Sequence, residues 1–160
     1  IDFGYSNDPT AIIDVYIYGK IIYIDEICYQ TEMLSSDIIR VLKEDKKNIE
    51  VISESADPRL IDEIYNAGID IKPVKKFKGS IQASIMKMQE YTIHITKRST
   101  NVRREFNNYT YRQDKEGKWL NEPIDMYNHA IDACRYVVME KLLGDYGSGM
   151  QAADILGLMG

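Results

Sequence analysis

The sequence is short of cysteine and of long apolar runs. Its two cysteines, Cys28 and Cys134, cannot build a disulfide framework or, by themselves, a four-ligand zinc site. No apolar stretch approaches the ~20 residues that a membrane-spanning helix requires, and no signal-peptide pattern opens the chain. We therefore expect a reduced, intracellular setting and no membrane partner.

Familiar motifs of small-molecule chemistry are also missing. The sequence contains no Walker phosphate loop, no dinucleotide glycine fingerprint, no Gly-x-Ser-x-Gly elbow and no zinc-spaced set of Cys and His. The length and composition suit a single domain, because a chain of 160 residues that is 44% hydrophobic and 28% charged can bury a core.

The charge is unevenly divided along the chain. Residues 72–104, called the basic segment below, hold nine Lys or Arg and one acid, Glu90. This segment carries +8, so the remainder carries −13 against the overall net charge of −5. Such a division is compatible with phosphate contact, with docking of an acidic partner, or with chance clustering on a solvated surface.

The first half of the chain is patterned as strands followed by helices. Residues 11–18 and 21–28 are dense in Ile, Val and Tyr and, with a short strand at Asp2, predict an antiparallel meander. Apolar residues recur at helical spacing over 34–42, where Ser35 or Ser36 is placed to cap the helix.

A strand-helix-strand unit follows, which implies parallel pairing. Its strands are predicted at 50–53 and 69–74, and the helix between them is bounded by Asp57 as cap, Pro58 as first residue and Gly68 as exit. The pattern beyond this unit predicts further elements, namely a helix at 81–88, a strand at 91–95, a short helix at 100–106, a hairpin at 109–112 and 118–120, and a helix at 125–143.

Three acids occupy positions suited to chemistry. Asp2 lies on the first strand, Glu54 lies at the carboxyl end of the strand at 50–53, and Asp132 lies on the last helix, three residues after His129. Converging carboxylates repel unless a cation neutralises them, and Mg²⁺ or Mn²⁺ favours carboxylate oxygen. Two such ions ~3.5–4 Å apart can activate a water and stabilise the leaving oxygen in phosphodiester cleavage.

Simpler explanations exist for these and for neighbouring residues. Acids at strand ends are often only solvated, and a lone histidine is often structural. Asp57 is explained as a helix cap, and Asp8 by its turn before Pro9 with a supporting role at most. Asp125 is assigned to capping of the last helix, with a place near the metals as the alternative.

Three other residues receive structural assignments. Cys134 lies on the apolar stripe of the last helix and is assigned to the core. His94 lies on a predicted strand with no acid nearby in sequence. Phe77, within a lysine-rich loop, is a candidate base contact but is more simply a buried anchor.

Three segments in order carry a family resemblance. They are DFGYSNDP at residues 2–9, SESADP at 53–58 and NHAIDACRY at 128–136. Together with the order of strands and helices, they resemble the C-terminal nuclease domain of the large terminase subunit of tailed bacteriophages, within the ribonuclease H-like superfamily. The likeness spans residues 2 to about 143.

The resemblance implies an α/β fold of the ribonuclease H-like type, a mixed sheet of three antiparallel and then parallel strands flanked by helices, plus a β-hairpin. It implies a metal-dependent endonuclease that cleaves concatemeric viral double-stranded DNA during genome packaging with two Mg²⁺ or Mn²⁺ ions. Asp2, Glu54 and Asp132 match the family's metal-binding acids, with Glu in place of Asp at position 54. His129 matches a position that approaches a metal in some members.

Further expectations follow from the same resemblance. The nuclease domain is expected at 1–143 and a C-terminal tail at 144–160, with an ATPase domain upstream of Ile1. The small terminase subunit and the portal are expected partners, and the host cytoplasm is the expected location.

The DNA is expected to contact the basic segment. With most contacts going to phosphates, cleavage should be largely independent of sequence. Two alternatives stay open, a non-cutting DNA-binding or portal-docking module and another ribonuclease H-like nuclease of resolvase or transposase type. The expected phosphate contacts are Lys75, Lys76, Lys78, Arg103 and Arg104.

Overall fold

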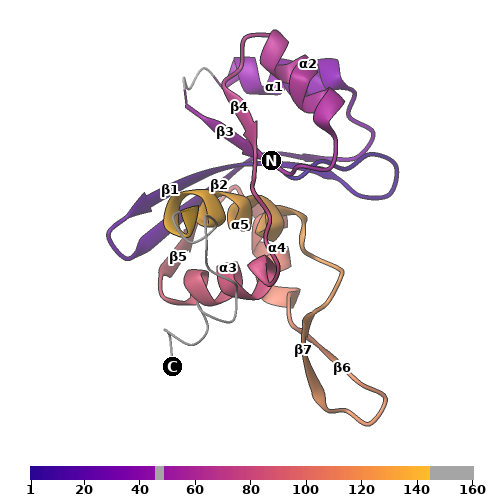
Figure 1. The fold of residues 1–160 in the computed structure, drawn as a ribbon, viewed down its shortest axis with the longest axis vertical. Coiled ribbons are helices and arrows are strands. Elements are labelled where there is room, and N and C mark those ends of the chain that lie inside the picture. Colours follow the sequence, from indigo (N-terminus) through magenta and orange to yellow (C-terminus); the bar gives the residue numbers. More distant parts are fainter. Residues whose placement is uncertain (46–48, 145–160) are drawn as a thin grey trace.

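The computed structural model of the chain describes residues 1–45 and 49–144. Its strands form a mixed sheet with helices on either side (Figure 1). The α/β architecture with mixed sheet, flanking helices and hairpin confirms the predicted fold class. Beyond Gly144, the predicted tail lies outside the described residues.

A long antiparallel hairpin forms the centre of the sheet. Strand β1 (Thr10–Tyr18) pairs antiparallel with β2 (Ile21–Gln30). Tyr18 lies opposite Ile21 next to the turn, and a bulge between Ile12 and Ile13 shifts the pairing. Their β-branched and aromatic residues favour the pleated conformation. Strand β5 (Thr92–Ile95) adds to the free side of β2 in parallel orientation.

Residues 1 and 2 join this sheet to a second pair of strands. Asp2 forms an isolated antiparallel bridge with Ala11. On the other side, the nitrogen of Ile1 donates to the Ile52 carbonyl at 2.6 Å, and the Glu54 nitrogen donates to the Ile1 carbonyl at 3.0 Å. The predicted first strand is thus a two-residue link, which fixes Asp2 between β1 and β3.

The second pair is parallel, as predicted. Strands β3 (Val51–Ser53) and β4 (Ile71–Pro73) are connected by α2 (Pro58–Asn66). The carboxylate of Asp57 accepts a hydrogen bond from the Leu60 nitrogen at 3.1 Å, which confirms its predicted role as helix cap.

Helices cover both faces of the sheet. Helix α1 (Ser35–Glu44) and α2 pack over Ile12 and Ile71 on one face, whereas α3, α4 and α5 pack over Ala11, Ile22 and Ile24 on the other. The bounds of the three helices on the second face are Ser80–Gln89 for α3, Thr100–Asn108 for α4 and His129–Leu142 for α5. No helix among the described residues is long and apolar enough to cross a membrane.

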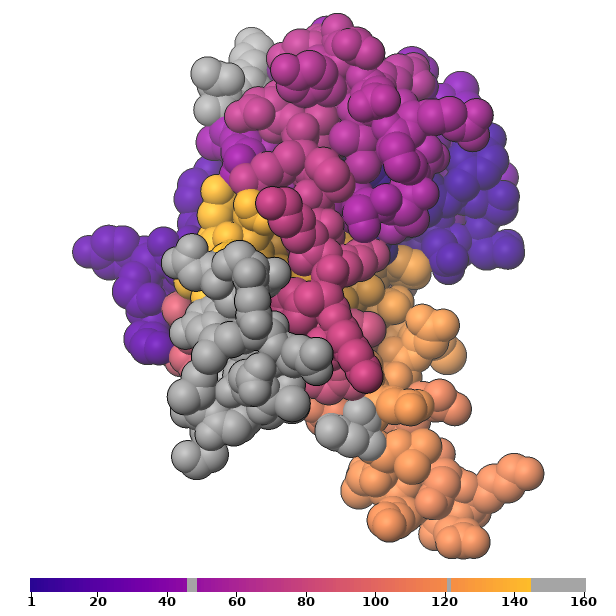
Figure 2. Space-filling model, in the orientation of Figure 1, coloured from indigo at the N-terminus to yellow at the C-terminus, as the bar shows by residue number. Residues whose placement is uncertain are grey.

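The predicted second hairpin projects from the body. Strands β6 (Tyr111–Gln113) and β7 (Trp119–Pro123) pair antiparallel. Both the ribbon and the space-filling view show this hairpin standing apart from the layered part of the molecule (Figures 1 and 2).

Two predicted helix caps are wrong. Leu34 is the N-cap of α1, and Ser35, already helical, donates instead to Glu63 of α2 at 2.6 Å. The last helix begins at His129 rather than Asp125, because Tyr127 has a left-handed φ of 56° that interrupts helical backbone. Asp125 therefore does not cap α5.

Candidate functional site

Asp2 is fixed by contacts to both of its carboxylate oxygens. Asp2 is only 8% exposed. The Tyr136 hydroxyl donates to Oδ1 at 2.9 Å, and Nδ1 of His129 lies 3.2 Å from Oδ2. Both partners lie on α5, so these contacts join the centre of the sheet to that helix. The hydrogen bond to Asp2 raises the pKa of His129, with burial opposing the shift.

Asp132 lies one turn after His129, on the same side of α5. Its pKa is raised to about 6, first by burial and then by the negative charges of Asp2 and Glu105, whereas the Arg135 guanidinium opposes the shift. Arg135 Nε is 3.3 Å from Asp132 Oδ1. Arg135 itself is buried, and its Nη1 atom has no hydrogen-bond partner among the described residues.

Glu54 follows directly after β3 and is partly buried. Its pKa is raised, first by burial and then by the charge of Asp2, while Lys76 acts in the opposite direction. The charge of Asp2 therefore acts on both Glu54 and Asp132, although the three residues are distant along the chain. That the three carboxylates form one metal site stays a prediction.

The electrostatic field of these acids suits a hard cation. Two of the three carboxylates have raised pKa values because burial and neighbouring negative charge disfavour their ionised forms. A divalent ion would stabilise those ionised forms and would find oxygen ligands. As they stand, no three His, Cys, Asp or Glu side chains within residues 1–45 and 49–144 lie close enough together to form a metal site. Their carboxylate oxygens are nevertheless the ligand type that a hard divalent ion prefers.

Several contributors to the site were not predicted. Tyr136 and Arg135 lie within a segment singled out for its motif, yet nothing in the sequence assigned them contacts to Asp2 or Asp132. Glu105 carries no sequence signal at all. It is fully buried and accepts hydrogen bonds from the Ala130 and Ile131 nitrogens at 2.7 and 3.0 Å.

Asp8 reaches the site through a tight loop. Its Oδ1 atom lies 3.6 Å from His129 Nε2, which agrees with the predicted supporting role. Gly4 makes this loop possible, because a Cβ atom there would lie 2.3 Å from the Asp8 carbonyl oxygen. No side chain fits that space.

The basic segment does not form one continuous cationic face. Lys72 is paired with Glu50 and Glu140, both at 2.7 Å. Lys87 is paired with Glu90, and Arg98 with Asp25. These cations are neutralised locally, so the +8 of the segment overstates what a polyanion would meet.

The five predicted DNA contacts differ in their surroundings. All are exposed. Lys76 lies over the Tyr136 ring, 5.2 Å from its centroid, and Arg104 lies 5.9 Å from the Tyr29 centroid. The Arg103 guanidinium already donates to the Thr96 and Lys97 carbonyls. Lys75 and Lys78, like Lys76, have no ion pair among the described residues.

Three structural assignments are confirmed. Phe77 packs against Ile52, Val74 and Tyr136, so it is an anchor for the lysine loop. Cys134 is completely buried in the core, where burial raises its pKa to about 12. His94 is exposed, and its ring lies 5.3 Å from the Tyr23 ring at a tilt of 45°, on a strand distant from the acids in the sheet order.

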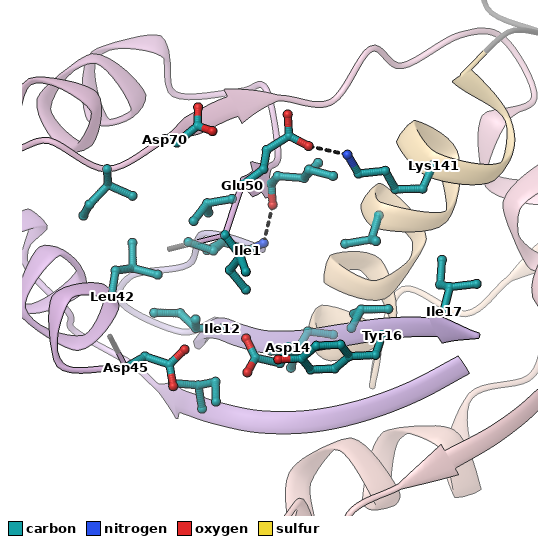
Figure 3. A pocket seen from close by; sticks show the side chains of 18 of the residues that line it. Ile1, Ile12, Asp14, Tyr16, Ile17, Leu42, Asp45, Glu50, Asp70 and Lys141 are labelled. Carbon is teal, nitrogen blue, oxygen red and sulfur yellow. Dashed lines mark hydrogen bonds and ion pairs between the residues drawn. The ribbon is translucent and has the colours of Figure 1, made fainter. Parts of the chain in front are cut away.

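Two hollows differ in their relation to the acids. One of about 790 Å³ lies between β1, the start of β3 and the ends of α1 and α5, with Ile1 and Ile12 in its wall and the Glu50–Lys141 ion pair beside it (Figure 3). None of the candidate acids lines it. Another, of about 610 Å³, is lined by His129, Asp8, Tyr29 and Arg104, and so adjoins the site.

Comparison with known proteins identifies the family. A model of the terminase RNase H-like domain matches residues 2–140. The chain belongs to the terminase RNase H-like domain family. The large terminase subunit of Bacillus phage SPP1 is 32% identical over 143 residues, which cover 85% of this chain and 34% of that protein. The chain thus spans about a third of that relative's length.

Solved structures of terminase nucleases agree with this membership. The SPP1 large terminase nuclease domain, solved with bound Mn, is 31% identical with a TM-score of 0.80, covering 87% of this chain and 82% of that one. The nuclease of thermophilic phage G20c, solved with bound magnesium, shares the fold at 15% identity and a TM-score of 0.51, covering 86% and 84%. The homology supports a nuclease.

The raised pKa of Glu54 leads to a test of the acidic field in the metal-free protein. Above its unfolded pKa of 4.5, the folded state disfavours the charged carboxylate, so this group removes stability as pH rises through the raised value. Glu54→Gln should therefore raise the free energy of unfolding at pH 7 in EDTA by less than about 1 kcal/mol.

Urea unfolding of the wild type and of Glu54→Gln, at pH 7 and below about pH 4, measures this difference in stability. The gain should vanish below about pH 4, where the wild-type carboxyl is protonated in both states. Glu116→Gln, in the exposed turn of the second hairpin, is the matched control. Equal stability of wild type and Glu54→Gln at both pH values would contradict the acidic field.

Proposed function

We propose that this domain is a metal-dependent endonuclease that cleaves concatemeric viral double-stranded DNA during genome packaging. The observation that supports the proposal is that the negative charge of Asp2 acts on both Glu54 and Asp132 in a chain of the terminase RNase H-like domain family. The metals in the SPP1 and G20c nucleases support Mn²⁺ or Mg²⁺ as the cofactor.

The proposed metal ligands are Asp2, Glu54, His129 and Asp132. When bound, a pair of Mg²⁺ or Mn²⁺ ions supplies an activated water and charge stabilisation for the departing oxygen of the phosphodiester. Tyr136 fixes one oxygen of Asp2 through its hydroxyl and so orients that carboxylate. Arg135 holds Asp132 by a buried ion pair, which limits the rotation of its side chain.

The proposed DNA path passes two groups of cations, the three lysines at 75, 76 and 78 and the arginine at 104. Lys75, Lys76 and Lys78 lie on the Glu54 side, where Lys76 is close enough to lower the pKa of Glu54. Arg104 lines the hollow beside His129. Arg103 is the weakest of the five candidates, because its guanidinium is held by two carbonyls.

Such contacts go to phosphates rather than to base edges, so cleavage is largely independent of sequence. In the complete protein, the proposed partners are an upstream ATPase domain, the small terminase subunit and the portal, in the host cytoplasm. The nuclease unit is proposed to comprise residues 1–143.

Removing one ligand tests the chemistry. Asp132→Ala should lower plasmid cleavage in Mn²⁺ or Mg²⁺ by at least about a hundredfold, since a metal contributes several kcal/mol to the transition state. EDTA should abolish cleavage by the wild type. Asp62→Ala, which replaces an exposed acid on α2, is the control and should cut normally.

Full cleavage by Asp132→Ala would refute the assignment of the site. Absence of cleavage by the wild type in either metal would favour the non-cutting DNA-binding or portal-docking module. Preference for branched junctions over plain duplex would favour a nuclease of the resolvase type.

Replacing Lys75, Lys76 and Lys78 by alanine tests the DNA path. Each lost phosphate contact should reduce the slope of log affinity against log salt by about one, so the triple variant should lose about three. Fluorescence anisotropy with duplex DNA at several salt concentrations measures the slope.

A control with the same net charge replaces Lys20, Arg40 and Lys43, which lie outside the basic segment. The control should retain the wild-type slope. An unchanged slope in the Lys75, Lys76 and Lys78 variant would move the DNA path elsewhere.

A further inference from the structure

The start of α5 is capped from another helix. Asn128, its N-cap residue, makes no side-chain capping hydrogen bond. Instead, Oε2 of Glu105 on α4 accepts from the Ala130 and Ile131 nitrogens at 2.7 and 3.0 Å. These amides are in the first turn of α5, where free N–H groups and the helix dipole attract a negative charge.

The second oxygen of Glu105 is occupied as well. The Tyr29 hydroxyl on β2 donates to Oε1 at 2.6 Å. Glu105 is 0% exposed, and each of its described hydrogen bonds is accepted, as expected for a carboxylate. Glu105 acts on the acids of the site through its negative charge, which raises the pKa values of Asp132 and His129.

Tyr29 also contacts the site directly. Its ring packs edge-to-face on the His129 ring, with centroids 6.4 Å apart. The pair of Glu105 and Tyr29 therefore caps the first turn of α5 and limits how the His129 ring rotates. That turn presents His129 and Asp132 together.

We propose that Glu105 and Tyr29 are positioning residues that hold the first turn of α5, and with it His129 and Asp132, in the arrangement that binds the metal. The inference rests on the proposed function, since it treats His129 and Asp132 as metal ligands. Outer residues that orient ligands typically account for ten- to hundredfold of metal affinity.

Isothermal titration of Mn²⁺ into the metal-free protein tests the proposal, with unfolding measured in parallel. Glu105→Gln keeps the shape of the side chain and should weaken Mn²⁺ binding by about tenfold or more. Tyr29→Phe changes no charge, so a weakening in this variant, smaller but in the same direction, reports position rather than electrostatic attraction.

Val138→Ala is the matched control for a purely structural role. Val138 is fully buried on α5, more than two turns after His129, so its truncation destabilises the helix without touching the first turn. This variant should lose stability and keep the wild-type affinity for Mn²⁺.

The outcomes separate the two hypotheses. If the wild type binds Mn²⁺ and both Glu105→Gln and Tyr29→Phe bind it within about twofold, the positioning role is refuted. If Glu105→Gln does not fold, Tyr29→Phe decides by the same criterion. If the wild type binds no Mn²⁺, the proposed function fails instead.

Discussion

The contact between Asp2 and α5 is the interaction on which the site depends. Asp2 lies on the two-residue link between β1 and β3, and Tyr136 and His129 reach it from one helix. This contact sets the distance between the sheet and α5, and therefore the place of Asp132 relative to Asp2. Buried Glu105 caps the first turn of α5 and so holds the start of the helix that carries His129 and Asp132.

The arrangement gathers negative charge where water is partly excluded. Burial and mutual repulsion raise the pKa values of Asp132 and Glu54, so the metal-free site is electrostatically unfavourable at neutral pH. Arg135 and Lys76 offset part of that repulsion from opposite sides. A divalent cation would remove the remainder, which links the affinity of the site for metal to the stability of the fold.

Local signals in the sequence predicted local structure well. Asp57 and Pro58 marked the start of α2. Strand ends, helical spacing and family motifs singled out the acids at 2, 54 and 132, and their role as metal ligands stays a prediction. Predictions failed where tertiary contacts decided. Ser35 bonds to α2 instead of capping its own helix, and the cap of α5 comes from Glu105, 24 residues before His129. The net charge of the basic segment was misleading because partners distant in sequence, such as Glu140 for Lys72 and Asp25 for Arg98, neutralise some of its cations.

The most direct test of this account is the stoichiometry of Mn²⁺ binding to the metal-free protein and to Asp2→Asn. Asn at position 2 can still accept the Tyr136 hydrogen bond but lacks the charge that two ions would share. The account predicts two Mn²⁺ ions bound per wild-type chain and a loss of that binding in Asp2→Asn, with the fold retained. Equal binding by the two proteins, or none by the wild type, would contradict it.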